Sequence, residues 1–200
     1  MKSFAVAIVS LIFLLVVSGF NADLLASEAL VLQQGERAPA LNFSMLNSPA
    51  EVVSWQTVKQ DVVVLDFWAT WCPPCAASVP HMNALAKDFE GQPIRFISIT
   101  YEPARIVKPF LEKYQMKTSV AIDHDFAMFK SYKAWGIPMI VVINKKRQVA
   151  AVLEPSTLTA AVLREIASGK IPHIPQHPGW KDPAGAEKYF RSTIEAKQNN

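Results

Sequence analysis

A pair of cysteines constrains this chain more than any other feature. Cys72 and Cys75 directly follow a valine-rich apolar run at residues 62–68 and come just before a helical pattern. They are the only two cysteines in the chain. A structural disulfide usually joins distant segments, because a longer loop restricts the unfolded chain more. A bridge between residues so close together adds little stability, so reactivity explains this pair better than stabilisation of the fold.

The apolar pattern predicts an α/β fold. A continuous run such as residues 62–68 is typical of a central strand buried on both faces. Strands and helices alternate along the chain, followed by a strand hairpin and a last helix capped by Ser156. This order predicts a mixed central sheet flanked by helices. The expected strands are 40–46, 51–55, 62–68, 94–100, 119–122, 139–143 and 148–153, and the expected helices follow the cysteines and lie at 103–114, 125–134 and 156–169.

The cysteines fall where such a fold gathers its chemistry. In open α/β sheets, ligands and reactive groups lie where the carboxyl ends of strands meet helix N-termini. Disulfide exchange needs one thiolate to attack and a second thiol to resolve the mixed disulfide. A helix N-terminus favours the thiolate of Cys72, and Pro73 and Pro74 suit a first helical turn. We expect Cys72 to be exposed and Cys75 to lie inside the first turn.

A C-x-x-C pair can also be half of a zinc site. Zinc would require two more ligands, typically a second cysteine pair or two histidines at short spacing. The chain has no further cysteine, and its histidines are scattered, at positions 81, 124, 173 and 177. Structural zinc is therefore disfavoured.

The first residues predict export. Lys2 precedes an uncharged apolar run at residues 4–17 and then small residues, which is the pattern of a secretory signal. An uncleaved anchor is the alternative, although a membrane span needs about 20 apolar residues. We expect a periplasmic or otherwise extracytoplasmic protein, in contact with a membrane only if this segment is uncleaved.

The expected organisation is a signal peptide or N-terminal anchor at 1–29, one domain at 36–169 and a proline-rich extension at 170–200, with a helix at 184–196. Half of the residues are hydrophobic, which is enough for a single core. The net charge of +3 is small, and no Lys/Arg block is interleaved with aromatic residues. Nucleic acid is therefore not an expected partner.

Two segments resemble the thioredoxin superfamily. Residues 64–75 (VLDFWATWCPPC) are similar to its active-site strand and loop, and residues 135–138 (WGIP) are similar to its cis-proline loop. The resemblance covers roughly residues 38–168. The short N-terminal strands, the helix and strand at 103–122 and the export signal make the chain similar to the TlpA/ResA branch of periplasmic or membrane-tethered proteins. The implied fold is a thioredoxin fold with N-terminal strands and a central helix–strand insertion.

The resemblance also implies roles for individual residues. Cys72 would be the attacking thiol and Cys75 the resolving thiol, with no cofactor other than their redox-active disulfide. Pro138 would follow a cis peptide bond and lie against the cysteines, and the backbone of Ile137 would pair with an extended substrate strand. Trp71, with Trp68, would shape the surface around the disulfide.

Asp66 is the third candidate catalytic residue. A carboxylate within an apolar strand is costly to bury unpaired, and burial raises its pKa, so Asp66 could accept the proton of Cys75 during resolution. Thioredoxins have Asp at the matching place; the alternative is a solvated or capping Asp at a strand end. The TlpA/ResA branch often carries Glu where this chain has Ser78. That difference suggests proton handling closer to thioredoxin's and weakens the transfer of a cytochrome-maturation role.

The predicted function is exchange of disulfides with protein substrates as a thiol–disulfide oxidoreductase. The TlpA/ResA branch mostly reduces its clients, so we expect a reductant supplied with electrons by a membrane partner. A disulfide-forming oxidase is one alternative. A copper(I)-binding thioredoxin-fold protein is another, because copper(I) favours thiolates, although His124 lies before the cis-proline loop. Peroxidase chemistry is disfavoured because the C-P-P-C sequence does not match a peroxidatic loop.

Overall fold

The computed structural model describes residues 32–46, 48–58 and 61–174 and three isolated positions, 185, 188 and 192. The expected signal or anchor at 1–29 lies outside the described residues, as do most of the C-terminal extension and of its expected helix. None of the helices in the described part of the chain combines the length and the apolar character that crossing a membrane requires.

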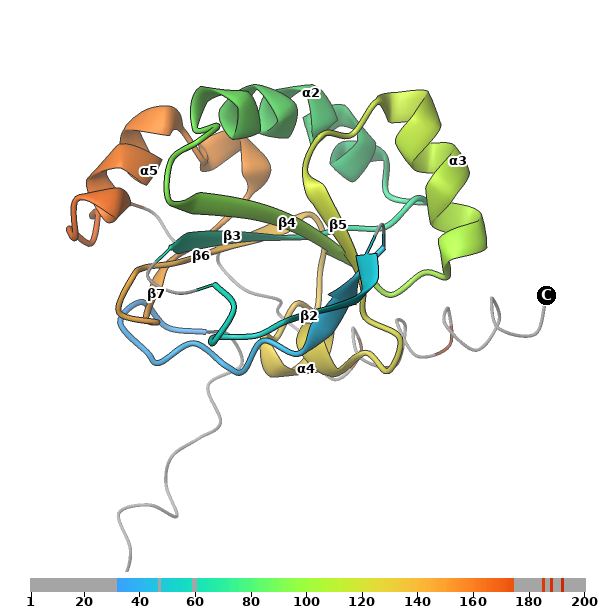
Figure 1. Ribbon diagram of the computed structural model, residues 1–200, viewed down its shortest axis with the longest axis horizontal. Helices are drawn as coiled ribbons and strands as arrows, with labels where there is room; N and C mark the ends of the chain where they lie inside the picture. Colours follow the sequence, from blue (N-terminus) through green and yellow to red (C-terminus); the bar gives the residue numbers. More distant parts are fainter. Residues whose placement is uncertain are drawn as a thin grey trace, which may run out of the picture.

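A single mixed sheet of seven strands crosses the domain in the order β2-β1-β5-β4-β3-β6-β7 (Figure 1). Strands β3, β4 and β5 run parallel to one another, and the remaining neighbours are antiparallel. The strands are β1 (Phe43–Met45), β2 (Ser48–Val53), β3 (Val62–Phe67), β4 (Ile94–Thr100), β5 (Ser119–Ile122), β6 (Met139–Ile143) and β7 (Val149–Leu153).

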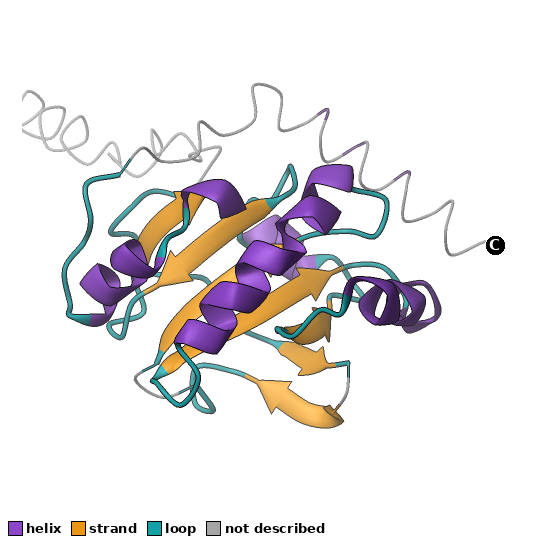
Figure 2. Cartoon of the chain, turned by 90° about the horizontal axis from the view of Figure 1, so that it is seen from above, coloured by secondary structure: helices purple, strands orange, loops and turns teal. Residues whose placement is uncertain are grey.

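The helices divide between the two faces of this sheet. Helices α2, α3 and α5 cover one face, and α4 packs on the other (Figures 1 and 2). Their bounds are α2 (Pro73–Asp88), α3 (Ala104–Tyr114), α4 (Ala127–Ser131) and α5 (Ala160–Ala167), with a short 3₁₀ turn, η2 (Pro155–Thr157), before α5.

Most predicted elements are confirmed, with small shifts at their ends. The N-terminal hairpin differs, because β2 begins at Ser48 and includes Pro49, which falls in the turn between the two predicted strands. Proline, which lacks an N–H donor, is tolerated in edge strands, and β2 lies at the edge of this sheet. Helix α4 is shorter than predicted. It begins after Phe126, and the Asp123 carboxylate accepts a hydrogen bond from the N–H of Phe129 at 2.9 Å.

The predicted cap at Ser156 is wrong. Ser156 lies inside the 3₁₀ turn that Pro155 begins, and the extended Leu158 separates this turn from the last helix. Thr159 is the cap instead, since its hydroxyl accepts a hydrogen bond from the N–H of Val162 at 3.3 Å. Ser and Thr are comparable caps, so residue type alone did not distinguish the two positions.

The described start of the C-terminal extension packs on the domain. Gln34 donates a side-chain hydrogen bond to the carbonyl of Pro172 at 3.0 Å. Ile174 packs against the hydrophobic cluster that includes Leu163 of α5. The folded unit therefore continues a few residues beyond the predicted boundary at 169.

The side chains of the central strand β3 point alternately toward α2 and toward α4. Successive side chains of a strand alternate between the two faces of the sheet. Leu65 packs in the same cluster as Phe129 of α4, whereas Val64 packs with Met82 of α2. Asp66, two residues after Val64, therefore projects toward the face that α2 covers.

Candidate active site

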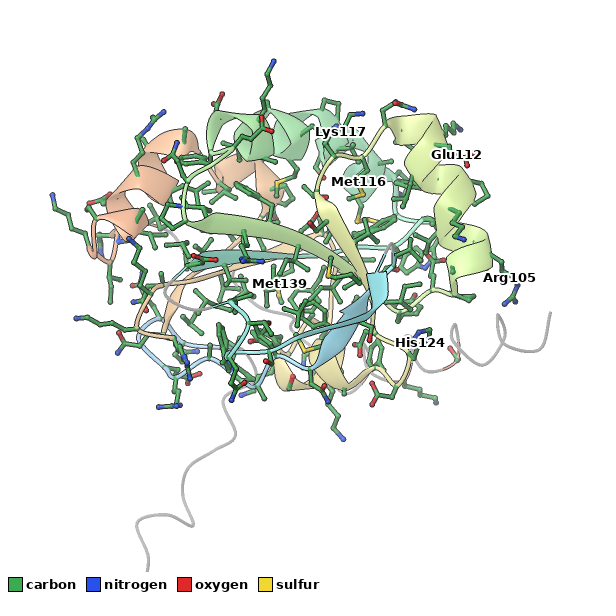
Figure 3. The ribbon with its side chains drawn as sticks, in the orientation of Figure 1. Arg105, Glu112, Met116, Lys117, His124 and Met139 are labelled. Carbon is green, nitrogen blue, oxygen red and sulfur yellow. A yellow bond between two sulfur atoms is a disulfide. The ribbon has the colours of Figure 1, made fainter. Side chains whose placement is uncertain are left out.

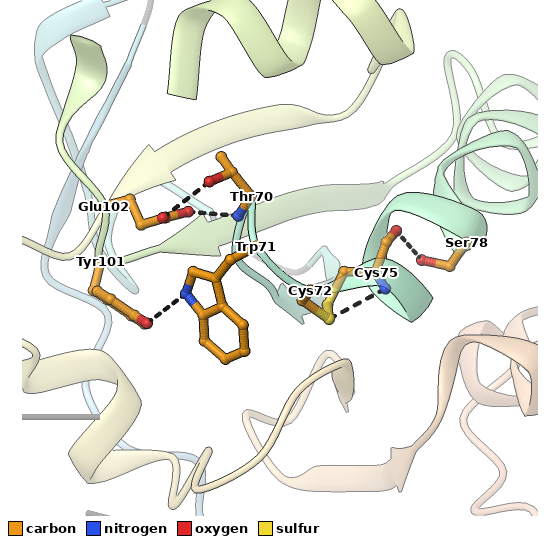
Figure 4. The surroundings of a disulfide bond; sticks show 7 residues. All are labelled: Thr70, Trp71, Cys72, Cys75, Ser78, Tyr101 and Glu102. Atoms are coloured by element: carbon orange, nitrogen blue, oxygen red, sulfur yellow. Dashed lines mark hydrogen bonds between the residues drawn. A yellow bond between two sulfur atoms is a disulfide. The ribbon is translucent and has the colours of Figure 1, made fainter. Parts of the chain in front are cut away.

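The two cysteines begin helix α2. Cys72 is the N-cap residue, and it forms a disulfide with Cys75 in which the two Cα atoms are 5.3 Å apart (Figure 4). The N–H of Cys75 also donates a hydrogen bond to the Cys72 sulfur, at 3.2 Å. Pro73 and Pro74 occupy the first turn, where helical N–H groups have no partner. After reduction, the positive end of the helix favours a thiolate at Cys72.

The loop between β3 and α2 is held by residues that follow β4. The carboxylate of Glu102 accepts hydrogen bonds from the N–H and the hydroxyl of Thr70, at 2.5 and 3.0 Å. The indole N–H of Trp71 donates to the hydroxyl of Tyr101 at 2.9 Å (Figure 4). These contacts fix the approach to Cys72 from the neighbouring parallel strand.

Sequence reasoning missed Glu102, which is fully buried. A signal was available, because Glu102 comes two residues after Thr100, the last residue of the predicted strand at 94–100. Neighbouring parallel strands place their carboxyl ends at the same edge, so an acidic residue there lies close to the loop that follows β3.

The expected exposure of Cys72 is wrong. Cys72 and Cys75 are each only 3% exposed. The reason is that the half-buried side chains of Trp71 and Ile137 pack against the cluster that contains both cysteines. Trp68 does not shape the surface either, because it is 1% exposed and its ring lies 4.8 Å from that of Phe110.

The predicted cis-proline segment lies beside this site. The Ile137–Pro138 peptide bond is cis. Met139, the next residue, begins β6 and pairs with Phe67, the last residue of β3. This pairing sets Ile137 and Pro138 next to the loop that leads to Cys72.

A pocket extends from this segment along α2. It has a volume of about 440 Å³. His81 is among its walls and hydrogen-bonds through its ring nitrogen Nε2 to the carbonyl oxygen of Leu158 at 2.8 Å. The residues lining the pocket are Pro74, Ala77, Ser78, His81, Pro138, Glu154, Pro155 and Ser156.

Asp66 is buried within the sheet, not solvated at a strand end. It is 3% exposed, and one carboxylate oxygen, Oδ2, accepts a hydrogen bond from Ser98 at 3.1 Å. The other oxygen, Oδ1, has no hydrogen-bond partner among the residues that the structure describes. Burial raises the pKa of Asp66 from 3.8 to about 7, and the hydrogen bond from Ser98 opposes part of this shift. Its carboxyl can therefore accept or release a proton near neutral pH.

Asp66 lies on the same face of the sheet as the cysteines, between two residues that pack against α2. Trp68, which directly follows β3 and lies two residues after Asp66, packs in one cluster with Cys72 and Cys75. Val64, on the other side of Asp66, packs against the middle of α2. Asp66 therefore lies beneath α2, between its first turn and its centre.

The described residues contain no group of three or more His, Cys, Asp or Glu side chains arranged to hold a metal ion. His124, the histidine considered for copper, is an exposed residue of the turn after β5 (Figure 3).

The sequence is similar to those of known redox proteins. Residues 35–152 match the model of the AhpC/TSA family. Thiol-disulfide oxidoreductase ResA of Bacillus cereus is 30% identical over 119 residues, which are 59% of this chain and 68% of that protein. ResA of Bacillus subtilis (strain 168) is 26% identical over 147 residues, which are 73% of this chain and 79% of that protein.

Solved structures show the same fold. The thioredoxin domain of a thiol-disulfide oxidoreductase from Bacteroides vulgatus has a TM-score of 0.60 at 21% identity, over 68% of this chain and 99% of that chain. A thiol:disulfide interchange protein of the thioredoxin family from Chlorobium tepidum TLS has a TM-score of 0.56 at 20% identity, over 70% and 99%. The chain belongs to the AhpC/TSA family and is a TlpA/ResA-like thiol–disulfide oxidoreductase of the thioredoxin superfamily.

Proposed function

We propose that this oxidoreductase is an extracytoplasmic reductant of protein disulfides in which Cys72 attacks and Cys75 resolves. The observation that carries the proposal is the Cys72–Cys75 disulfide at the N-terminus of α2, beside the Ile137–Pro138 segment. The helix N-terminus stabilises a thiolate at the first cysteine, and the second cysteine is within bonding distance of it.

The reaction starts from the reduced dithiol. The Cys72 thiolate attacks one sulfur of a substrate disulfide, that bond breaks, and the substrate's other sulfur leaves as a thiolate. Cys75 then loses its proton to the Asp66 carboxylate and attacks the Cys72 sulfur. The mixed disulfide breaks, the second substrate thiolate leaves, and the protein disulfide forms. Two electrons pass from the protein to the substrate.

The substrate would approach over the cis-proline segment. Its extended chain would pair with the backbone of Ile137, and Trp71 would form the opposite wall. The pocket between Pro74 and Pro138 supports this path, because it opens beside the disulfide loop and its walls are largely apolar. A hydrophobic side chain near the substrate cysteine would fit there, with His81 in the pocket wall.

The proposed direction of electron transfer and the proposed location of the protein rest on other features. The TlpA/ResA branch, which the chain resembles, mostly reduces its clients, and the apolar run at residues 4–17 supports export. Outside the cytoplasm a reductant must itself be re-reduced, so a membrane protein that delivers electrons to the Cys72–Cys75 disulfide is the expected partner.

Replacement of the resolving cysteine tests the assignment of roles. In Cys75→Ser, the Cys72 thiolate still attacks, but no second thiol releases the adduct. We expect this variant to accumulate a stable mixed disulfide with insulin, detected by mass spectrometry of alkylated samples, whereas the wild type shows none.

Asp88→Asn serves as the matched control. Asp88 is an exposed residue near the end of α2, away from the cysteines and from the pocket beside Pro138. We expect the control to behave like the wild type. An adduct on Cys75 in Cys72→Ser, equal in amount to that on Cys72 in Cys75→Ser, would reverse the assigned roles.

A further inference from the structure

A chain of two hydroxyl groups leads away from Asp66. Ser98 lies opposite Asp66 in the pairing of β3 with β4, and its hydroxyl donates to Asp66 Oδ2 at 3.1 Å. The Ser98 oxygen lies 2.7 Å from the hydroxyl oxygen of Thr118, just before β5, and either hydroxyl can be the donor. Ser98 is fully buried, whereas Thr118 is 8% exposed. The chain therefore runs from a buried carboxylate toward solvent.

Thr118 ends this chain at a surface pocket. Strand β5 begins at Ser119, opposite Ile97, so the first residues of β4 have no β5 neighbour. A pocket of about 300 Å³ occupies the resulting gap. Thr118 lines it, and so do exposed residues from the loop between α2 and β4, at the opposite end of α2 from Cys72. The pocket is therefore open to water at a site remote from the disulfide.

From this arrangement, and given the proposed role of Asp66 as proton acceptor, we infer that Ser98 and Thr118 form a proton-relay chain. It connects Asp66 with solvent in the pocket beside β5 while a bound substrate covers the disulfide. Asp66, Ser98 and Thr118 thus let the proton of Cys75 leave on the side opposite the substrate.

The relay conserves protons and atoms at each step. The unpartnered oxygen, Oδ1, accepts the Cys75 proton, and rotation about the Cβ–Cγ bond turns the protonated oxygen toward Ser98. Asp66 then donates to the Ser98 oxygen as Ser98 passes its own proton to Thr118, and Thr118 passes its proton to water. The hydroxyl pair can reverse its direction of donation, which this step requires.

Charged groups line the pocket at the outer end of this hydroxyl chain. Glu90, Arg95 and Lys117 line the pocket, and Arg95 is paired with Asp61 at 2.6 Å. Lys117 directly precedes Thr118 where the chain enters β5 (Figure 3). The inner end lies among apolar side chains of the two clusters under α2. The hydrogen bonds through Ser98 therefore give a proton on Asp66 a polar exit at Thr118.

Thr118→Val tests the relay, because valine keeps the shape of threonine without its hydroxyl. The reduced protein is mixed with oxidised glutathione, quenched with acid and analysed by mass spectrometry, which measures decay of the glutathione mixed disulfide. A general base accelerates a reaction by about 10²–10⁴-fold. We expect a smaller slowing of this decay, about tenfold, in Thr118→Val between pH 6 and 8. Ser98→Ala, which removes the first link, should show the same slowing.

Two comparisons separate a relay from a structural effect. Thr118→Ser restores the hydroxyl and should restore the rate, and Ser119→Ala removes a neighbouring hydroxyl of the same pocket and should change nothing. Imidazole buffer, a small proton carrier, should accelerate Thr118→Val in proportion to its concentration but leave the wild type unchanged.

Decay at the wild-type rate in Thr118→Val, or slowing that neither Thr118→Ser nor imidazole reverses, would overturn the relay. Failure of the proposed function is a different result. In that case the wild-type protein itself would form no mixed disulfide at Cys72.

Discussion

Cys72→Ser is expected to reduce the rate of insulin-disulfide reduction to that of dithiothreitol alone. A serine hydroxyl is not ionised near neutral pH, whereas the Cys72 thiolate is favoured by the N-terminus of α2. Without this nucleophile no mixed disulfide forms, so neither half of the exchange takes place. The measurement is the turbidity that develops as the insulin B chain precipitates, with dithiothreitol as the electron source.

Cys75→Ser provides the comparison within the same helix turn. It should also lose turnover, yet still react once with insulin through Cys72. We expect Cys72→Ser to lose both turnover and the first reaction, and Cys75→Ser to lose turnover alone. That difference would assign attack to Cys72 and resolution to Cys75. Retained turnover in Cys72→Ser would contradict the proposed chemistry.

Asp66→Asn is expected to stabilise the oxidised protein at alkaline pH. Burial raises the pKa of Asp66 from 3.8 to about 7, so between these values the folded protein binds a proton that the unfolded chain has released. Stability therefore falls as pH rises from about 4 to 7 and stays low above that range. A shift of this size corresponds to about 4 kcal/mol. Asn is neutral at every pH and avoids this cost.

Urea unfolding at pH 4 and pH 8 measures the effect. The variant and the wild type should have similar free energies of unfolding at pH 4, and the variant should exceed the wild type by about 4 kcal/mol at pH 8. Asp88→Asn, an exposed substitution near the end of α2, should leave the pH dependence unchanged. A wild-type protein whose stability does not fall between pH 4 and 7 would show that Asp66 is not held in an unfavourable charged state.

The same substitution is expected to slow resolution of the mixed disulfide, because Asn cannot accept the Cys75 proton. The buried carboxylate would then lower stability in exchange for catalysis, as strained or costly groups at active sites often do. The proposed role in catalysis would thus account for a charged residue in a strand that is otherwise apolar.

Sequence patterns predicted the sheet well, because its central strands are buried on both faces. Strands β4, β5 and β6 have the bounds that their apolar runs indicate. Pro93 directly precedes β4 and Pro138 directly precedes β6, which marks where these two strands begin. The helix termini were harder, since Ser156 and Thr159 both satisfy the preference for a cap and only the 3₁₀ turn at Pro155 distinguishes them.

The sequence pointed to the parts of the candidate active site that are close together in the chain and missed the parts that depend on contacts between strands. Cys72 and Cys75 follow from their spacing and position alone. Burial of Cys72 depends on Ile137, which arrives from a segment about sixty residues later. The contact of Glu102 with Thr70 and the hydroxyl chain from Asp66 depend on the register of parallel strands, which single-sequence patterns do not specify.

The reduction potential of the Cys72–Cys75 disulfide, measured at equilibrium against glutathione, tests the central claim most directly. It decides whether the folded protein gives electrons to substrates or takes them. A reductant should have a value near that of thioredoxin, about −270 mV. A value near that of DsbA, about −120 mV, would make the protein a disulfide-forming oxidase and contradict the proposed direction.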